Sequence, residues 1–334
     1  MYCEQQEQEL NYSSASSLND LPGSSPSLDS FDSLTQLNNF DDLMIVKKLN
    51  QAKFPVFLTF SPSRGQYFAM KVFPHTKNGI SPFFANEARF EPLQHNNIIS
   101  IVHTETEKQA VFEENINKVS YTLMELAPFG DFFDLIMTQK IPFDETLCRT
   151  YFHQLIEGIE YMHSYGVSHL DLKLENLLVG NNFVLKIGDF DQAYIQNQGH
   201  VVTKGTVCYR APELIRGNCQ KPEAADIFSA GIILFLFKSG GVLPHSERQK
   251  YKNIDLFALM LTNPRTFWEK HCEIQNKSLD FFGKDFINLF NAMVAADPEQ
   301  RPSISQIKNS KWYKGPIYTQ EEVLLYMSKF FASN

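Results

Sequence analysis

The chain has 334 residues, of which 43% are hydrophobic and 20% charged, a composition typical of a globular protein rather than of a fibrous or wholly disordered one. Its longest apolar run, residues 228–237, is about half the length of a membrane span, so we expect no transmembrane helix. No basic stretch followed by an apolar one marks a secretory signal. The five cysteines are scattered without a Cys-x-x-Cys pair, which argues against a disulfide framework or a zinc site and favours a reducing, cytoplasmic location.

The net charge of −8 lies entirely in the first 46 residues, which contain eight acids and no Lys or Arg. The rest of the chain carries 30 basic and 30 acidic residues, so it offers no electrostatic footprint for nucleic acid. Residues 1–40 are rich in Ser, Asn, Gln and Asp and have few clustered apolar side chains, which predicts a disordered tail. This tail is either a phosphorylatable regulatory arm or a solvated leader without a specific partner.

The segment after the tail has the pattern of a small sheet. Residues 56–60 and 67–73 are strand-like and flank a turn-rich stretch at 61–66, which predicts a hairpin. Residues 82–94 have helical spacing, and further strands are expected at 98–103 and 119–126. We therefore predict a sheet-rich lobe with one helix over residues 41–126.

The following segment is mainly helical. An apolar stripe at residues 152–162 predicts a helix that ends near Gly166, and residues 177–179 and 183–187 flank Gly180 as a second hairpin. Further helices are expected at 224–238, 255–262, 285–294 and 303–308. We predict a larger helical lobe over 127–314. Residues 315–334 form an extension with a short amphipathic helix near 321–331, which either packs on that lobe or docks a partner.

Residues able to carry chemistry lie in two segments of this second lobe and at two positions of the first. Residues 169–176 read HLDLKLEN and place Asp171, Lys173 and Asn176 on one loop, and residues 189–191 read DFD. Acids and an amide on loops suit hard divalent cations and a hydroxyl nucleophile. Lys71 lies in a hydrophobic strand, where a lysine is costly unless it is paired, and Glu87 on the following helix is the natural partner.

Three more motifs complete the pattern: GTVCYRAPE at 205–213, DIFSAG at 226–231, and Arg301-Pro302. In this order and spacing, the motifs resemble those of a eukaryotic protein kinase of the serine/threonine type, over about residues 42–313. The resemblance implies an α+β, bilobal protein-kinase fold. Such a fold has a small antiparallel-sheet lobe with one major helix and a larger, mainly helical lobe.

The resemblance also implies a role for each matching residue. Lys71 would hold the α- and β-phosphates of ATP, and Glu87 would orient Lys71. Asp171 would accept or orient the substrate hydroxyl proton, and Lys173 would stabilise the transferring phosphoryl group. The remaining members of the implied site are Thr206, which supports Asp171 and Lys173; Asn176 and Asp189, which hold Mg²⁺ or Mn²⁺; and the nucleotide-binding positions Asn50, Ala52, Pro55, Phe57, Ala69, Lys71, Met124, Glu125, Ala127, Asp131 and Leu178.

Scaffold roles are implied for three further residues. Glu213 and Arg301 match the structural ion pair of the family, and Asp226 matches the anchor beneath the catalytic loop.

Asp131 and Glu175 place two acids where the family often receives a basic side chain of the substrate. They predict either basic-directed specificity or an ordinary solvated acidic surface.

The sequence departs from the family pattern in four features, the first of which covers three residues. Asn50, Ala52 and Pro55 stand where the phosphate loop has its three glycines, which predicts a weaker or stiffer clamp. Leu170 replaces the arginine of His-Arg-Asp, so we expect activity without activation-loop phosphorylation, for which Thr203 is the nearest candidate site. Asp191 replaces the glycine of Asp-Phe-Gly and should hinder reorganisation there without itself being a metal ligand. Glu91 stands where an apolar residue commonly packs against Phe190, which predicts a shifted helix or an intruding water.

Three functions remain open at this point. The first is an ATP- and metal-dependent serine/threonine kinase of protein substrates, acting as a monomer with neither nucleic acid nor membrane as a partner. The survival of every charged catalytic residue favours it. The second is a pseudokinase scaffold that acts by protein interaction, favoured by the loop without glycines. The third is a small-molecule kinase, which the complete activation segment from 189 to 213 disfavours.

Overall fold

The computed structural model describes residues 40, 42–50, 53–112, 115–138, 141–198, 201, 205–245 and 254–331. The chain divides into two compact units. One contains Met1–Gly130 with Asp189–Asp191, and the other contains Asp131–Gly188 and Gln192–Asn334. The predicted tail at residues 1–40 lies outside the described residues except for Phe40. None of the described helices combines the length and the apolarity that crossing a membrane requires.

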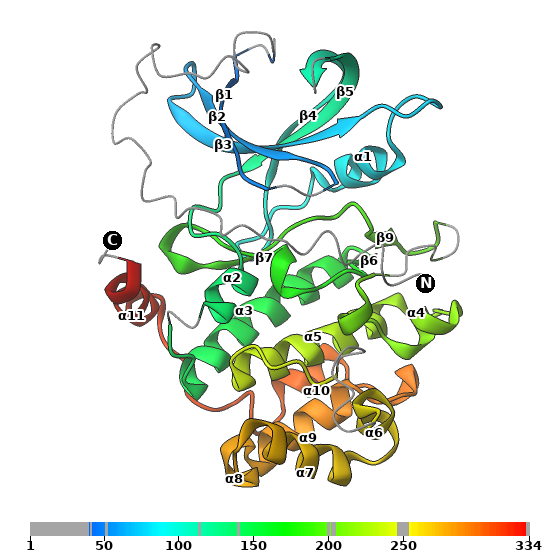
Figure 1. Ribbon diagram of the computed structural model, residues 1–334, viewed down its shortest axis with the longest axis vertical. Helices are drawn as coiled ribbons and strands as arrows, with labels where there is room; N and C mark the ends of the chain where they lie inside the picture. The colour runs from blue at the N-terminus through cyan, green and yellow to red at the C-terminus, as the bar shows by residue number, and fades with distance from the viewer. Residues whose placement is uncertain are drawn as a thin grey trace. The chain divides into compact units, whose positions relative to one another are not determined.

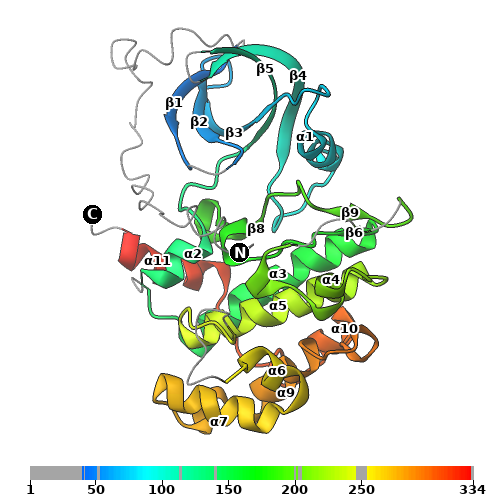
Figure 2. The same ribbon diagram turned by 45° about the vertical axis from the view of Figure 1, so that its right-hand side comes forward.

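The first unit is a curled antiparallel sheet with one short helix beside it (Figures 1 and 2). The strands follow the order β1-β2-β3-β5-β4. Their bounds are β1 (Met44–Lys48), β2 (Val56–Ser61), β3 (Gln66–Pro74), β4 (Ile101–Phe112) and β5 (Asn115–Glu125), with α1 (Pro82–Glu87) between β3 and β4. The predicted hairpin of β2 and β3 is confirmed, with Ser61 opposite Gln66 at its turn.

The predicted helix at 82–94 is much shorter in the structure. The α-helix α1 ends at Glu87 and continues as one 3₁₀ turn over Ala88–Phe90. Glu91, directly before Pro92, still has right-handed helical backbone, so the helix tightens to a 3₁₀ turn here rather than breaking.

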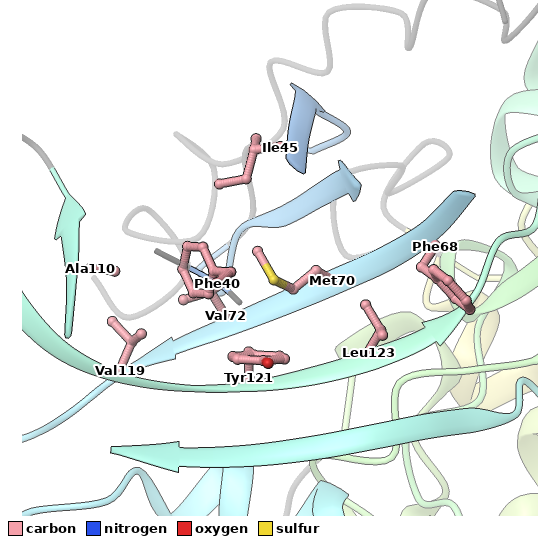
Figure 3. Packing of buried hydrophobic residues seen from close by; sticks show 9 residues of the cluster. All are labelled: Phe40, Ile45, Phe68, Met70, Val72, Ala110, Val119, Tyr121 and Leu123. Carbon is pink, nitrogen blue, oxygen red and sulfur yellow. The ribbon is translucent and has the colours of Figure 1, made fainter. Parts of the chain in front are cut away.

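Strand alternation divides the side chains of this sheet between two faces. One face carries the buried cluster that Figure 3 shows. Its members come from the start of the unit and from β1, β3, β4 and β5: Phe40, Ile45, Phe68, Met70, Val72, Ala110, Val119, Tyr121 and Leu123. Phe40 is 1% exposed, and its ring meets the Tyr121 ring edge-on at 5.5 Å. The prediction that Phe40 belongs to the tail was therefore wrong, because its side chain is a buried member of this cluster.

The second unit is built around two helices that run side by side, α3 (Glu145–Ser164) and α5 (Pro222–Ser239) (Figure 2). The side chain of Asp144 accepts a hydrogen bond from Leu147 N at 2.7 Å and so begins α3. Helix α5 is buried on nearly all sides, which explains its continuous apolar sequence. The predicted hairpin forms as β7 (Leu177–Val179) and β8 (Leu185–Ile187).

The other elements of the second unit include four helices that the sequence analysis did not predict: α2 (Phe132–Met137), α4 (Pro212–Arg216), α7 (Pro264–Gln275) and α8 (Leu279–Phe282). The predicted helices appear as α5, α6 (Leu256–Thr262), α9 (Lys284–Met293), α10 (Ile304–Lys308) and α11 (Gln320–Phe331). The strands β6 (Val167–Ser168) and β9 (Tyr194–Ile195) pair with each other. The α+β class, with a small antiparallel sheet and a larger helical part, is confirmed.

Helix α11 packs on its own unit. Val323 and Met327 are fully buried, and the rings of Phe331 and Phe183 lie 5.1 Å apart. The Tyr326 hydroxyl donates to the Pro142 carbonyl at 2.7 Å. Of the two possibilities considered for this segment, packing on the helical part is the one observed.

Two buried histidines in this unit predict a loss of stability in acid. Burial lowers the pKa of His245 to about 4, with Asp255 opposing the shift and His271 adding to it, and burial also lowers the pKa of His271. The unfolded chain takes up its histidine protons near pH 6.5, so it binds more protons than the folded chain between pH 6.5 and 4. We expect the free energy of unfolding to fall by about 3 kcal/mol across this range through His245, at about 1.4 kcal/mol per pKa unit.

The measurement is urea unfolding at a series of pH values between 7 and 4, on wild type and on His245→Gln. The variant should show a shallower pH dependence, with the remaining slope due in part to His271. An identical slope in the two proteins would show that His245 does not titrate as its burial requires.

Candidate active site

The lysine of β3 lies among three carboxylates within the first unit. Lys71 Nζ is 2.6 Å from Glu87 Oε2, 2.5 Å from Asp189 Oδ1 and 3.5 Å from Asp191 Oδ2. Glu87 is fixed in turn by Thr122, whose hydroxyl donates to Glu87 Oε1 at 2.7 Å. Burial alone would lower the pKa of Lys71, but the three carboxylates outweigh burial and hold this pKa above its ordinary value. Lys71 is therefore a fixed cation.

The face of the sheet that carries Lys71 also carries part of the predicted nucleotide-binding set. Ala69 pairs with Met124 across β3 and β5, and both side chains are half-buried. Glu125, the last residue of β5, is held by Ser100 just before β4, because its backbone N–H donates to the Ser100 carbonyl and its carboxylate accepts from Ser100 N at 2.8 Å. Ala127 is half-buried after β5, and its predicted contact with a nucleotide stays a prediction.

Phe57 does not lie on this face and must be removed from the predicted set. It is opposite Met70 in the sheet and packs against the cluster closed by Phe40. Val56 and Leu58, opposite Lys71 and Ala69, lie on the face that carries Lys71 instead. The prediction failed because side chains along a strand alternate between the two faces of the sheet. An error of one residue in the register therefore moves a side chain to the other face.

The phosphate loop without glycines is tied to its surroundings. The Asn50 side chain accepts from Val56 N at 2.9 Å, and the carbonyl of buried Pro55 accepts from Val72 N at 3.0 Å. The Phe54 ring lies 4.8 Å from the Phe73 ring. Ala52 lies outside the described residues. Asn50 thus contacts the start of β2, and Phe54 and Pro55 contact β3. The weaker or stiffer clamp stays a prediction.

Glu91 does not face Phe190. It accepts a hydrogen bond from Thr104 Oγ1 at 3.1 Å, while the neighbouring Phe90 places its ring 5.3 Å from the Phe190 ring. The 3₁₀ turn after α1 rotates the chain so that Phe90 supplies the apolar contact. The shifted helix or intruding water expected at Glu91 stays a prediction.

The predicted catalytic loop is assembled within the second unit. Asp171 Oδ1 accepts from the backbone N–H and the hydroxyl of Thr206, each at 2.7 Å. Lys173 Nζ is 3.2 Å from Asp171 Oδ2 and donates to Thr206 Oγ1 at 3.1 Å. The Asn176 side-chain N–H₂ donates to the Asp171 carbonyl at 2.9 Å, which directs the Asn176 carbonyl oxygen away as an acceptor.

Asp226 anchors this loop from beneath. Its carboxylate accepts from His169 N at 2.9 Å, from Leu170 N at 2.8 Å and from His163 Nε2 at 2.9 Å. These bonds hold Leu170 at φ = 62°, a conformation that a leucine rarely adopts. A side chain at Gly205 would lie 2.5 Å from the Leu170 carbonyl, so only glycine lets the two segments meet. The anchor implied for Asp226 is thus present.

Two acids near the start of α2 lie in a partly desolvated setting. Asp131 caps α2 by accepting from Asp134 N at 2.8 Å and is bridged to Leu178 of β7. Burial, with help from Asp134 and Glu175, raises the pKa of Asp131 to about 7. Burial also raises the pKa of Glu175, whose Oε2 is buried without a hydrogen-bond partner among the described residues.

Sequence reasoning missed the residues that support the first half of the site. Thr122 and Phe54 gave no recognisable signal, because their role depends on strand register and loop folding. Asn86, next to Glu87, donates to the carbonyls of Phe190 at 3.4 Å and Asp191 at 3.1 Å. Its position on the helix that carries Glu87 is the one signal that could have suggested it.

Comparison with known proteins agrees with these arrangements. Residues 53–313 match the model of the protein kinase domain. CBL-interacting protein kinase 26 of Oryza sativa subsp. japonica is 32% identical over 284 residues, which cover 82% of this chain and 52% of that protein. CBL-interacting serine/threonine-protein kinase 8 of Arabidopsis thaliana is 34% identical over 196 residues, 58% of this chain and 40% of that protein. The chain spans about half the length of these relatives. The resemblance drawn from the motifs is confirmed, and the chain belongs to the protein kinase family.

Proposed function

We propose that this chain is a serine/threonine kinase that transfers the γ-phosphate of ATP to hydroxyl groups of proteins. The observation that carries the proposal is the contact of Lys71 with both Glu87 and Asp189. In protein kinases this ion pair and this acid must both be in place for phosphoryl transfer, and a protein that had lost catalysis would be free to lose them. The relatives named as protein kinases support the same function.

Each half of the site has a defined task in this reaction. Lys71 binds phosphate oxygens through its ammonium group. Glu87 holds that ammonium group in place through their ion pair. Asp171 orients the acceptor hydroxyl and takes up its proton, and Thr206 holds this carboxylate in place through Oδ1. Lys173, next to that carboxylate, stabilises negative charge on the transferring group.

The donor groups present fit a divalent metal ion. The carboxylate of Asp189 is 37% exposed, and the oxygen of Asn176 is available as an acceptor. No group of three His, Cys, Asp or Glu side chains arranged for a metal occurs among the described residues. Mg²⁺ is ordinarily bound by one or two protein oxygens together with water and substrate phosphates, so oxygen donors of this kind suit it, and Mn²⁺ accepts the same kind of donors. The ion would neutralise charge on the phosphate oxygens.

The test is transfer of label from ATP to a Ser/Thr peptide library in the presence of Mg²⁺ or Mn²⁺. Label on serine and threonine residues that requires the divalent ion supports the proposal. Nucleotide binding without any transfer would favour the scaffold that the loop without glycines also suggests. Thermal stabilisation by ATP alone does not separate the two, since a scaffold can bind nucleotide.

We also propose that substrates carry a basic side chain near the acceptor hydroxyl. The desolvated carboxylates of Asp131 and Glu175 support this, because a guanidinium would supply both the countercharge and the partner that Glu175 Oε2 lacks within the described part of the chain. We expect Asp131→Asn with Glu175→Gln to reduce the preference for arginine-containing peptides by about 10- to 100-fold, in line with about 1.5–3 kcal/mol for a hydrogen bond to a charged group.

The measurement is kcat/KM for peptides that differ only in one arginine or glutamine. With ATP at saturation, which offsets any loss of nucleotide contact at Asp131, the double variant should affect the arginine peptide and leave the glutamine peptide nearly unchanged. Asp280→Asn, which removes an exposed acid of α8, serves as the control. Equal losses on both peptides would show that the two acids do not read the substrate.

We further propose that activity does not require a phosphorylated activation segment. Leu170 is buried and cannot pair with a phosphate, and the backbone of the loop is already held by Asp226. Thr203 lies outside the described residues. Thr203→Ala should retain kcat within about twofold of wild type, because no phosphate contact is lost at Leu170. Loss of activity in a folded Thr203→Ala protein would contradict this.

A further inference from the structure

The carboxylate at residue 191 has no counterpart in the family motif, where this position is a glycine without a side chain. In this chain Asp191 Oδ2 lies 3.5 Å from Lys71 Nζ. Lys71 therefore faces one carboxylate more than the motif provides, beside those of Glu87 and Asp189.

The three carboxylates differ in their exposure to solvent. The side chain of Glu87 is 1% exposed and that of Asp191 is 12% exposed, whereas that of Asp189 is 37% exposed. Asp189 is thus the member that an ion from solvent can reach. A divalent cation held by Asp189 would neutralise part of the charge of that carboxylate and so weaken the attraction of Asp189 for Lys71. Glu87 and Asp191 remain to hold the ammonium.

The place of Asp191 is fixed from the backbone as well. Asn86 of α1 donates to the carbonyls of Asp191 and of Phe190, and the Phe190 ring packs on Phe90. The helix that provides Glu87 thereby also holds the segment that provides Asp191. The backbone that carries the Asp191 carboxylate is consequently held in place beside Lys71 by these contacts.

We infer that Asp191 is a positioning residue for Lys71, a second lasting counter-ion that keeps the ammonium in its phosphate-binding place when Asp189 engages the metal ion. The inference rests on the proposed function, since it concerns how Lys71 meets phosphate. It makes the place of Lys71 depend on two carboxylates instead of on Glu87 alone. Removing either one leaves the other as an anchor, and removing both leaves none once the metal is bound.

A double-mutant cycle isolates this shared anchoring. Glu87→Gln, Asp191→Asn and the double variant are compared with wild type by calorimetric titration with ADP in the presence of Mg²⁺. Repulsion between Asp191 and the phosphates acts in both backgrounds and cancels in the cycle. We expect the double variant to bind more weakly than the product of the single effects predicts, by about tenfold, within the range usual for groups that share one partner. The kcat for peptide phosphorylation should show the same excess loss.

Two controls keep the outcome specific. Asp280→Asn combined with Glu87→Gln should give simply multiplicative effects, because Asp280 is an exposed acid of α8. In a Lys71→Met background, the effects of Asp191→Asn and Glu87→Gln on ADP binding should simply multiply, because the shared partner is gone. Asp191→Gly, which restores the family residue, repeats the cycle should the asparagine variant fold poorly.

Single effects that multiply within about twofold would overturn the inference and leave Asp191 as a packing residue, because groups that share no partner act independently. A wild-type chain that binds no nucleotide would instead refute the proposed function. These results are distinguishable, because the first requires measurable binding by the wild type.

Discussion

Asp171→Asn is expected to lower kcat for peptide phosphorylation by about 10²- to 10⁴-fold, the range for loss of a general base. Asparagine has the shape of aspartate and can still accept from Thr206, so the loop should keep its structure. The asparagine amide cannot take up a proton from the acceptor hydroxyl, and it has no charge with which to orient that hydroxyl. Since the contacts of Lys71 lie elsewhere in the chain, KM for ATP should change little.

The measurement is steady-state kinetics over a range of ATP and peptide concentrations. Asp280→Asn is the matched control, an equivalent change at an exposed position, and should retain wild-type kcat. A variant Asp171→Asn with unchanged kcat would mean that another group accepts the proton. A parallel rise in KM for ATP would point to a disturbed fold rather than to lost chemistry.

Arg301→Met is expected to lower the free energy of unfolding by about 3–5 kcal/mol, the cost of leaving one partner of a buried ion pair alone. Arg301 makes a forked contact with Glu213, with distances of 2.5 Å and 2.7 Å, and both side chains are buried. It also donates to the carbonyls of Ala224 and Ala295. Losing the guanidinium leaves the Glu213 carboxylate and both carbonyls without these donors.

Urea unfolding of wild type, Arg301→Met and the double variant with Glu213→Gln measures this effect. The double variant should recover part of the loss, because the stranded charge is removed. Lys221→Met breaks the exposed pair with Glu299, which has a distance of 2.5 Å, and should change the midpoint only slightly. Equal shifts for the exposed and the buried pair would contradict the role assigned to burial.

Patterns of local origin were predictable from the sequence. The hairpin of β2 and β3 and the long helix α3 are encoded by alternation and by an apolar stripe, which report local burial directly. The pairing of Lys71 with Glu87 followed from the cost of a lone charge in a hydrophobic strand. The cluster of Asp171, Lys173 and Thr206 followed from the family resemblance. Both the pair and the cluster are present in the structure.

Features that depend on distant partners could not be predicted in this way. Phe57 was assigned to the wrong face because the sequence does not fix where β2 begins relative to β3. Phe40 looked like part of a polar tail, and only the assembled sheet shows that it packs against Tyr121. Asp191 and Lys71 are in contact although they are far apart in the sequence. The glycine of the family motif has no side chain that could make this contact.

The most direct test of the central claim is single-turnover transfer of the γ-phosphate from ATP to a Ser/Thr peptide library, with wild type beside Asp189→Asn and Lys71→Met. The account predicts divalent-ion-dependent label on serine and threonine with wild type. It predicts loss of that label in both variants, because one removes an ionised metal ligand and the other removes the cation that holds the phosphates. A folded wild type that transfers no phosphate with either Mg²⁺ or Mn²⁺ would contradict the account, as would variants that transfer it as fast as wild type.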